Sequence, residues 1–308
     1  MKDTPIIHPT RGLPSLHQEG PPKFNDTLSR RTPRPANRMR LAQVWASLPL
    51  LVYFMSAFSP LAAAAPLSVR IAYLGHADSD AHAGARQGIK EANAQGKFLG
   101  LNYELVESAD VGAALAAEVA AIVVDADADT LPTLAGQARG VPVLNVRAED
   151  DSLRGLCIAN LLHTIPSQAM RVDALKQWRQ KQPDSQAKAR AWDAAAEMYA
   201  GSQLNKRYKD AAGRVMTDQA WAAWAAVKLV SDTVARLHAT DAATLLNALR
   251  KDLAFDGQKG VDMSFRDNGQ LRQPLLLVED GKIVGEAPVR GVAANGDLDS
   301  LGNTPCSP

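Results

Sequence analysis

The chain has 308 residues, of which 46% are hydrophobic and 22% are charged, and its formal net charge at pH 7 is +1. This composition indicates an ordinary globular protein. The near-neutral charge gives no reason to expect a nucleic-acid partner.

Residues 1–38 contain many prolines among polar and basic side chains. Such a segment cannot bury enough apolar surface to become ordered. We expect it to be disordered or untranslated, because a signal sequence that begins at Met39 indicates a start codon placed too far upstream.

Residues 39–64 have the pattern of a secretory signal peptide, with a positive charge, an apolar run over 48–58 and small residues before the cleavage site. The alanines predict cleavage after Ala64. A membrane anchor is the alternative, but only ten residues lie between Pro49 and Pro60, and a spanning helix needs about 20. We therefore expect a periplasmic protein.

Residues 65–167 alternate short apolar runs with alanine-rich helical stretches. The run 121–124 is apolar throughout, as in a strand covered on both faces. Repeated alternation predicts an α/β lobe with a parallel sheet and helices on both sides. Strands are predicted over 69–74, 101–106, 121–124 and 141–144, and helices over 83–94, 111–117 and 130–139.

Residues 168–290 are mostly helical in composition, and no convincing strand appears before Val261. A hairpin is predicted at Glu279-Asp280-Gly281. Residues 291–308 are expected to form a flexible tail. The predicted helices cover 167–180, 187–199, 218–237 and 241–253, the last capped by Thr240, and the predicted strands cover 263–265, 275–278 and 282–284.

The two cysteines of the chain are Cys157 and Cys306. The oxidising periplasm would allow them to pair. The alternative is two unrelated thiols, because Cys157 lies in an apolar run that is expected to form a buried strand, and Cys306 lies in a tail of proline and serine. The sequence leaves both alternatives open.

Four segments carry a resemblance to a known family: CIANLLHTIPS at 157–167, FDGQKGVDMSFR at 255–266, QLRQPLLL at 270–277 and DLDSLG at 297–302. The chain resembles the periplasmic solute-binding proteins of the branched-chain amino-acid (type I) ABC transporter family. It is most similar to the branch associated with pyrroloquinoline-quinone-dependent alcohol catabolism.

The resemblance implies two α/β lobes with the ligand between them. Residues 170–192 are too few and too polar to hold the first strands of a second lobe. We expect one intact parallel-sheet lobe over 65–167 and a reduced, mostly helical second lobe with C-terminal strands over 168–290.

Ligands of open parallel sheets bind outside the carboxyl ends of the strands, where loops 76–82, 125–129 and 147–151 are expected. The resemblance implies that amides and hydroxyls of these loops hold a ligand carboxylate and that carboxylates hold its ammonium. The acidic loops favour a cationic or hydroxylated ligand over a bare anion. The candidate ligand-binding residues are His76, Asp78, Ser79, Asp125, Ala126, Asp127, Thr130, Ala148 and Glu149.

These residues also have simpler interpretations. Asp127 and Asp129 precede the helix at Thr130, where acidic side chains commonly cap a helix and complement its dipole. His76 and His82 are expected on a solvated loop, where histidines are commonly surface residues.

Histidine and aspartate alternate over 76–82 and 125–129, as metal ligands can, but the calcium-loop template fails at Thr130 and Gly136. We expect no metal and no other cofactor. The chain contains no Gly-x-Ser-x-Gly elbow, phosphate-binding loop, Gly-x-Gly-x-x-Gly or His-Glu-x-x-His motif, which argues against an enzyme.

Two functions follow from these expectations. The first is a non-catalytic periplasmic substrate-binding protein of an ABC importer, with a small solute and a transporter permease as partners, no nucleic acid, and membrane contact only through the transporter. The second is a degenerate binding-protein fold that acts as an interaction or scaffold module. A two-sided cleft at the predicted loops favours the first, and a flat face packed by the Trp221 helix favours the second.

Overall fold

The computed structural model describes residues 65–294 and 296–306. The expectations for residues 1–38 and for the signal peptide at 39–64 therefore lie outside the described residues. In the part of the chain that is described, no helix has the length and apolar character needed to cross a membrane.

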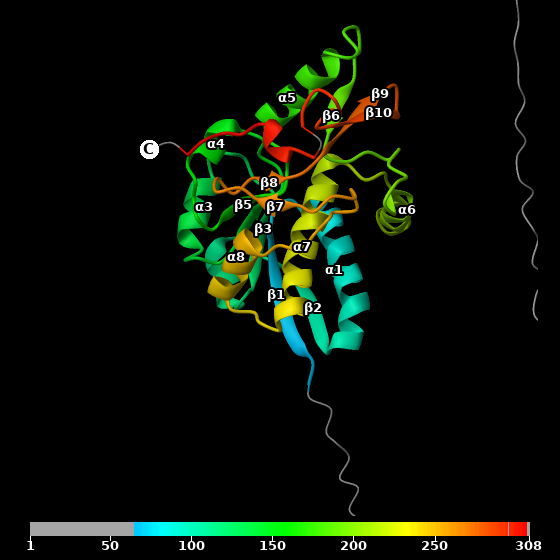
Figure 1. Ribbon diagram of the computed structural model, residues 1–308. Helices are drawn as coiled ribbons and strands as arrows, with labels where there is room; N and C mark the ends of the chain where they lie inside the picture. The colour runs from blue at the N-terminus through cyan, green and yellow to red at the C-terminus, as the bar shows by residue number, and fades with distance from the viewer. Residues whose placement is uncertain (1–64, 295, 307–308) are drawn as a thin grey trace, which may run out of the picture. The chain divides into compact units, whose positions relative to one another are not determined.

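The first lobe contains a parallel sheet of five strands in the order β2-β1-β3-β4-β5 (Figure 1). Both faces are covered, since every residue of β3 is buried. The predicted α/β class is confirmed, and strand β3 has the predicted bounds. The strands are β1 (Leu67–Leu74), β2 (Leu101–Glu107), β3 (Ala121–Val124), β4 (Val143–Asn145) and β5 (Leu161–His163).

Helices cover the two faces of this sheet because successive residues of β3 point to opposite sides. Ile122 and Val124 pack with α2 (Val111–Ala116), α3 (Leu131–Gln137) and α4 (Asp151–Gly155). Ala121 and Val123 pack in the core on the other face. That core includes α1 (Asp80–Leu99), α7 (Asp218–Leu237) and part of α8 (Ala242–Lys251).

Helices α1 and α7 approach each other through glycines of α1. A Cβ built on Gly84 would lie 2.0 Å from the carbonyl oxygen of Ala220, and one on Gly88 would lie 2.8 Å from Val227 Cβ. The two backbones therefore touch only because α1 lacks side chains at these positions.

This contact corrects the expected division of the chain at residue 167. Helix α7 has nearly the predicted bounds, but it covers the first sheet instead of forming part of a separate second lobe. Hydrophobic periodicity locates the buried face of a helix but does not indicate which sheet that face will meet.

The second lobe is built on a small antiparallel sheet in the order β10-β9-β6, packed against α5 (Gln168–Arg179). Its strands are β6 (Lys188–Arg190), β9 (Leu275–Glu279) and β10 (Lys282–Ala287). The predicted hairpin is confirmed, with Asp280 and Gly281 at φ 49° and 71°. This φ pair is the one that a two-residue hairpin turn requires.

The helix predicted over 187–199 is wrong. That segment forms β6 and an irregular loop, and α6 (Gly201–Ala212) begins only after Tyr199 and Ala200, both in the left-handed region. Strand β6 was missed because Lys188 and Arg190 are polar, as is common at the edge of a sheet. The last helix, α8, is capped by Asp241 and not by Thr240.

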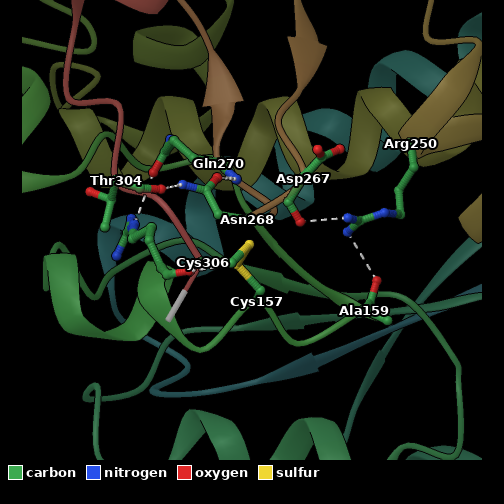
Figure 2. The surroundings of a disulfide bond; sticks show 9 residues. Cys157, Ala159, Arg250, Asp267, Asn268, Gln270, Thr304 and Cys306 are labelled. Atoms are coloured by element: carbon green, nitrogen blue, oxygen red, sulfur yellow. Dashed lines mark hydrogen bonds between the residues drawn. A yellow bond between two sulfur atoms is a disulfide. The ribbon is translucent and has the colours of Figure 1, made fainter. Parts of the chain in front are cut away.

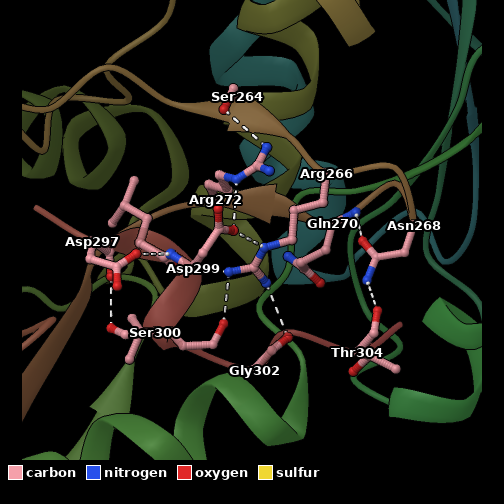
Figure 3. A network of polar contacts seen from close by, with 12 residues as sticks. Ser264, Arg266, Asn268, Gln270, Arg272, Asp297, Asp299, Ser300, Gly302 and Thr304 are labelled. Carbon is pink, nitrogen blue, oxygen red and sulfur yellow. Dashed lines mark hydrogen bonds and ion pairs between the residues drawn. The ribbon is translucent and has the colours of Figure 1, made fainter. Parts of the chain in front are cut away.

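The C-terminal segment differs from the flexible tail that was expected. Leu301 is fully buried beside α5, and η1 (Leu298–Ser300) precedes it. Figure 3 shows the Arg266 guanidinium donating to the carbonyls of this segment and to Asp299. Arg266 lies between β7 (Ser264–Phe265) and β8 (Leu271–Arg272), so these short strands hold the tail in place.

The two cysteines form a disulfide, with Cα atoms 5.6 Å apart (Figure 2). Cys157 is near the start of the loop that leads to β5, and Cys306 is in the tail. Asn268 donates to the carbonyl of Thr304 next to this bond. Of the two alternatives left open by the sequence, the structure contains the paired one.

Candidate ligand-binding site

The loops after β1 and β3 lie side by side, because β1 and β3 are neighbours in the sheet. The Tyr73 hydroxyl lies between the loops, 2.8 Å from Ser79 Oγ and 3.0 Å from Asp125 Oδ2. Burial raises the pKa of Tyr73 above its ordinary value, and the Asp125 carboxylate raises it further. The hydroxyl therefore keeps its proton and connects the two loops.

Asp125 belongs to the base of this site rather than to its surface, since its side chain is only 2% exposed. Its second oxygen, Oδ1, has no hydrogen-bond partner among the described residues. It lies 3.7 Å from Arg147 Nη1. A largely buried carboxylate with one free oxygen is a polar group that a nearby donor would stabilise.

Arginines pair with two of the carboxylates at the rim of the sheet. Arg147 Nη2 is 3.3 Å from Asp127. Arg171 of α5 makes two contacts with Glu149, at 2.7 and 3.0 Å, and a third at 2.8 Å with Asp218 of α7. Burial alone would lower the pKa of Arg171, but Asp218 and Glu149 raise it above its ordinary value.

The rim keeps an acidic lining. Arg147 and Arg171 pair with Asp127 and Glu149, but Asp129 and Asp150 of the same lining form no ion pair among the described residues. Such a surface suits a ligand that carries a cationic or hydrogen-bond-donating group.

The backbone amide of Ala148 is also not free for a ligand. Asn145 Oδ1 accepts from the amides of Arg147 and Ala148, at 3.1 and 2.9 Å. The side-chain nitrogen of Asn145, Nδ2, donates to the Ala148 carbonyl and lies 3.0 Å from His163 Nδ1. Ala148 therefore shapes the loop, and its hydrogen bonds are already made.

Arg154 also holds the loop 147–151 in place by hydrogen bonds. Its guanidinium is fully buried and donates to the carbonyls of Ala148, Asp150 and Ile165 and to Gln270 Oε1. Burial lowers the pKa of Arg154 to about 10. Arg154 therefore remains charged at neutral pH. Its hydrogen bonds join the rim loop to the segment that follows β5.

The helix-capping interpretation of the aspartates finds no support in the contacts. Thr130 occupies the N-cap of α3 without a capping side-chain hydrogen bond. Its hydroxyl donates instead to the Asp127 carbonyl at 2.9 Å. Thr130 and Asp129 are both exposed.

One groove of about 620 Å³ lies along the rim. Three of the candidate residues line it: Asp127, Ala148 and Glu149. The lining also includes Gln168 of α5, whose backbone amide donates to the Glu149 carbonyl at 2.9 Å, and Gln219 of α7. We call this the rim groove; it is lined by Asp127, Ala128, Asp129, Arg147, Ala148, Glu149, Asp150, Gln168 and Gln219.

The other candidates do not line the rim groove. Asp78 lines a separate hollow between α1 and α6, where Arg214 donates to its carbonyl. His76 is exposed on the first loop, Ala126 is half-buried, and Ser79 caps α1. His82 is buried and lies 2.9 Å from Glu107, so it is not the surface residue that was expected.

Sequence analysis missed Arg147, Arg171, Gln168 and Gln219. Gln168 and Arg171 belong to α5 and Gln219 belongs to α7. These helices are distant from the rim loops in sequence and approach them only in the folded protein. Arg147 follows β4 directly, and its place in the third loop is the one signal that could have identified it. Among the described residues, no group of three or more acidic, histidine or cysteine side chains is arranged to hold a metal.

Solved structures with a similar fold are solute-binding proteins. A branched-chain amino acid ABC transporter periplasmic ligand-binding protein from Burkholderia xenovorans superposes with a TM-score of 0.61 at 12% identity, covering 71% of this chain and 95% of its own. LivJ from Streptococcus pneumoniae, in complex with isoleucine, gives 0.53 at 13% identity, covering 71% and 98%.

A solute-binding protein of an ABC transporter from Rhodopseudomonas palustris, in complex with 3,4-dihydroxybenzoic acid, gives 0.54 at 10% identity and covers 70% and 95% of the two chains. No protein-family model matches the sequence, and no curated protein matches it. The five-stranded parallel sheet and these superpositions together show that the chain has the fold of the type I periplasmic binding proteins.

Proposed function

We propose that the protein is a non-catalytic periplasmic solute-binding protein of an ABC importer and that it holds a small polar solute in the rim groove. The observation that carries the proposal is the polar lining of this groove, in which Asp127 and Glu149 of two rim loops meet Gln168 of α5 and Gln219 of α7. The groove lies at the carboxyl ends of the parallel strands, where ligands of such sheets bind.

The chemistry of the walls limits the solute. Two carboxamides, two charge pairs and the further carboxylates of Asp129 and Asp150 can bind hydroxyl, carboxylate and ammonium groups together. A zwitterion or a hydroxylated acid fits this lining. Isoleucine and 3,4-dihydroxybenzoic acid, the ligands of two structural neighbours, have these groups and are reasonable first candidates.

A narrower proposal concerns the pathway. The link with pyrroloquinoline-quinone-dependent alcohol catabolism rests on the four resembling sequence segments alone, and the structural neighbours do not support that branch. Acids formed by alcohol oxidation belong in the ligand screen for this reason. The permease of an importer is the proposed protein partner.

One observation favours the alternative function, an interaction or scaffold module. Arg171 joins α5 to both Glu149 and Asp218, and these ion pairs cross the position at which a hinge would have to open. A protein locked in this way could present a fixed surface instead of capturing a solute.

A thermal-shift screen of the purified chain separates the two functions. The panel holds amino acids, alcohol-derived acids, pyrroloquinoline quinone and divalent metals. A stabilising solute should lose its effect in Asp127→Asn and Gln219→Ala and keep it in Glu118→Gln, an exposed control outside the groove. The absence of any stabilising solute, or equal stabilisation of all variants, would favour the scaffold.

A further inference from the structure

A second pocket, of about 230 Å³, lies between the loop that follows β6 and the β9–β10 hairpin. It shares no residue with the rim groove. We call it the Trp192 pocket; it is lined by Trp192, Ala195, Ala196, Glu197, Met198, Tyr199, Gln258, Lys259, Pro274, Leu276, Ile283 and Glu286.

The pocket has a rigid aromatic floor. The Trp192 ring is buried, stacks on the Trp221 ring at an interplanar angle of 9°, and donates from its Nε1 to Asn205 Oδ1 at 2.8 Å. The apolar lining that is open to a ligand comes from Met198, Tyr199 and Ile283. A ligand with an apolar body would therefore meet this surface above a fixed floor, which lowers the entropic cost of binding.

The same loop after β6 has an unusual backbone at its end. Tyr199 and Ala200 both have left-handed φ values, 51° and 68°. A Cβ built on Gly260 would lie 2.4 Å from the Tyr199 ring, so the ring rests directly on the Gly260 backbone. Strained backbone of this kind persists where the surrounding structure holds it, often at ligand sites.

Two carboxylates line this pocket without forming an ion pair among the described residues. Neither Glu197 nor Glu286 makes an ion pair or a side-chain hydrogen bond to another described residue. This distinguishes the Trp192 pocket from the rim groove, where Asp127 and Glu149 are paired with arginines.

Lys259 is the one basic residue in the lining. Its ammonium nitrogen donates to Gln273 Oε1 at 2.8 Å and to the Pro274 carbonyl at 3.1 Å, and it lies 3.8 Å from the centroid of the Trp221 ring. These three contacts use its donors, so its stem lines the pocket while its head is directed into the protein. Burial lowers the pKa of Lys259 well below its ordinary value, and the charges of Asp218 and Glu286 oppose this shift only in part. In either state the two glutamates leave the lining with a net negative charge.

Gln258 adds an acceptor to the same lining. Its Oε1 is buried and has no hydrogen-bond partner among the described residues. Rotation about the terminal bond of its side chain, which has a broad torsional preference, could offer this oxygen to a ligand. An unsatisfied acceptor favours a ligand that donates hydrogen bonds.

We propose that the Trp192 pocket binds a small organic cation, an amine with an apolar body, whose ammonium lies between Glu197 and Glu286. The apolar body would rest against Met198, Tyr199 and Ile283, above the buried Trp192. Aromatic faces beside carboxylates are the surroundings that attract such cations. This site does not depend on the function proposed for the rim groove.

Calorimetric titration of the full chain with three probes of similar size tests the charge preference. The probes are 2-phenylethylamine, 2-phenylethanol and phenylacetate, which are cationic, neutral and anionic at pH 7. We expect the amine to bind more tightly than the alcohol and phenylacetate to bind least. Tighter binding of phenylacetate would overturn the proposal and assign the pocket to Lys259 and an anion, and failure of all three probes to bind would overturn it as well.

Variants then locate the site. The double change Glu197→Gln and Glu286→Gln should weaken binding of the amine about tenfold, since two partly exposed charge contacts are removed, and should leave 2-phenylethanol unaffected. Asp280→Asn, at the tip of the same hairpin and outside the pocket, is the matched control and should change nothing.

Asp127→Asn separates this proposal from that for the rim groove, because it should leave amine binding unchanged while it removes the effect of a rim-groove solute. Equal affinity of the amine for the parent and for the Glu197/Glu286 double variant would overturn the proposed contacts. A loss of amine binding in Asp127→Asn would place the amine in the rim groove instead.

Discussion

Arg171 Nη2 lies 2.7 Å from Glu149 Oε1, and the same guanidinium contacts Asp218 at 2.8 Å. A side chain of the reduced lobe is thus bonded to a rim loop and to the first turn of α7. Closure about a hinge requires two bodies that move relative to each other, and these ion pairs oppose such movement.

We expect the radius of gyration to change little when a solute binds, as measured by small-angle scattering. Arg171→Met should lower the free energy of unfolding by about 1–3 kcal/mol, because it leaves half-buried carboxylates unpaired, and should speed hydrogen exchange in α5. Arg179→Met, an exposed position on the same helix, is the control. A clear ligand-dependent compaction of the parent protein would show that a working hinge survives.

The two aspartates after β3 should respond differently to neutralisation. Asp125→Asn should cost about 1–3 kcal/mol of unfolding free energy, since Asp125 is buried and bonded to Tyr73. Asp127 is 76% exposed on its side chain, so Asp127→Asn should change stability by less than about 0.5 kcal/mol. Urea denaturation of both variants checks this, and equal losses would place Asp127 in the structural core.

His163 should make the protein less stable in mild acid. Burial lowers its pKa well below the ordinary value, and the nearby Arg154 charge lowers it further. Since the unfolded state takes up the proton near pH 6.5, the stabilisation is present above this pH and is lost as the pH falls below it, by up to about 1.4 kcal/mol per pH unit.

Urea denaturation at pH 7, 6 and 5 measures this slope. His163→Gln should have a shallower pH dependence than the parent, although its absolute stability is lower. His76→Gln, on an exposed loop, should retain the parent slope. A parent stability that stays constant from pH 7 to pH 5 would contradict the prediction.

Gly84→Ala should destabilise the protein by about 1–3 kcal/mol, because the new methyl group would lie 2.0 Å from the Ala220 carbonyl and force α1 away from α7. The matched control is Gly136→Ala in α3, where a Cβ meets nothing within 4 Å and the better helix propensity of alanine should raise stability slightly. Thermal unfolding of both variants measures the difference, and the idea fails if they behave alike.

Replacement of Cys157 and Cys306 by serine should lower the unfolding free energy by about 2–4 kcal/mol, since the bond closes a long loop in the unfolded chain. Reductant should lower the stability of the parent by a similar amount. It should not affect the double serine variant, which serves as the control. Parent stability that does not depend on reductant would show that the bond does not form in solution.

Much of the first lobe could be predicted from sequence because its elements have strong local signals. The apolar run 121–124 and the long helix ending at Leu237 were placed almost without error. Strand β6 was not, because Lys188 and Arg190 lack the apolar alternation that marks a strand. The partners of α7 depend on glycines of α1 that have no helical signal of their own.

The site was harder to predict than the fold. The sequence places Ser79 and Asp125 at neighbouring strand ends, and the structure brings them together through Tyr73. It contains no local sign that Arg171 would cross from α5 to neutralise Glu149. Charge balance in a groove depends on side chains distant in sequence, so local patterns could indicate the carboxylates of the rim but not the arginine of α5 that pairs with one of them.

The disulfide also governs how the protein would respond to proteolysis. Its two cysteines are separated by 149 residues, a span that contains all of the second sheet and the exposed turn at Asp280. A single cut anywhere in that span would leave both fragments covalently joined, so the nicked protein would migrate as one band without reductant and as two with it. The second lobe can therefore be cut in its backbone and still remain covalently attached to the first lobe.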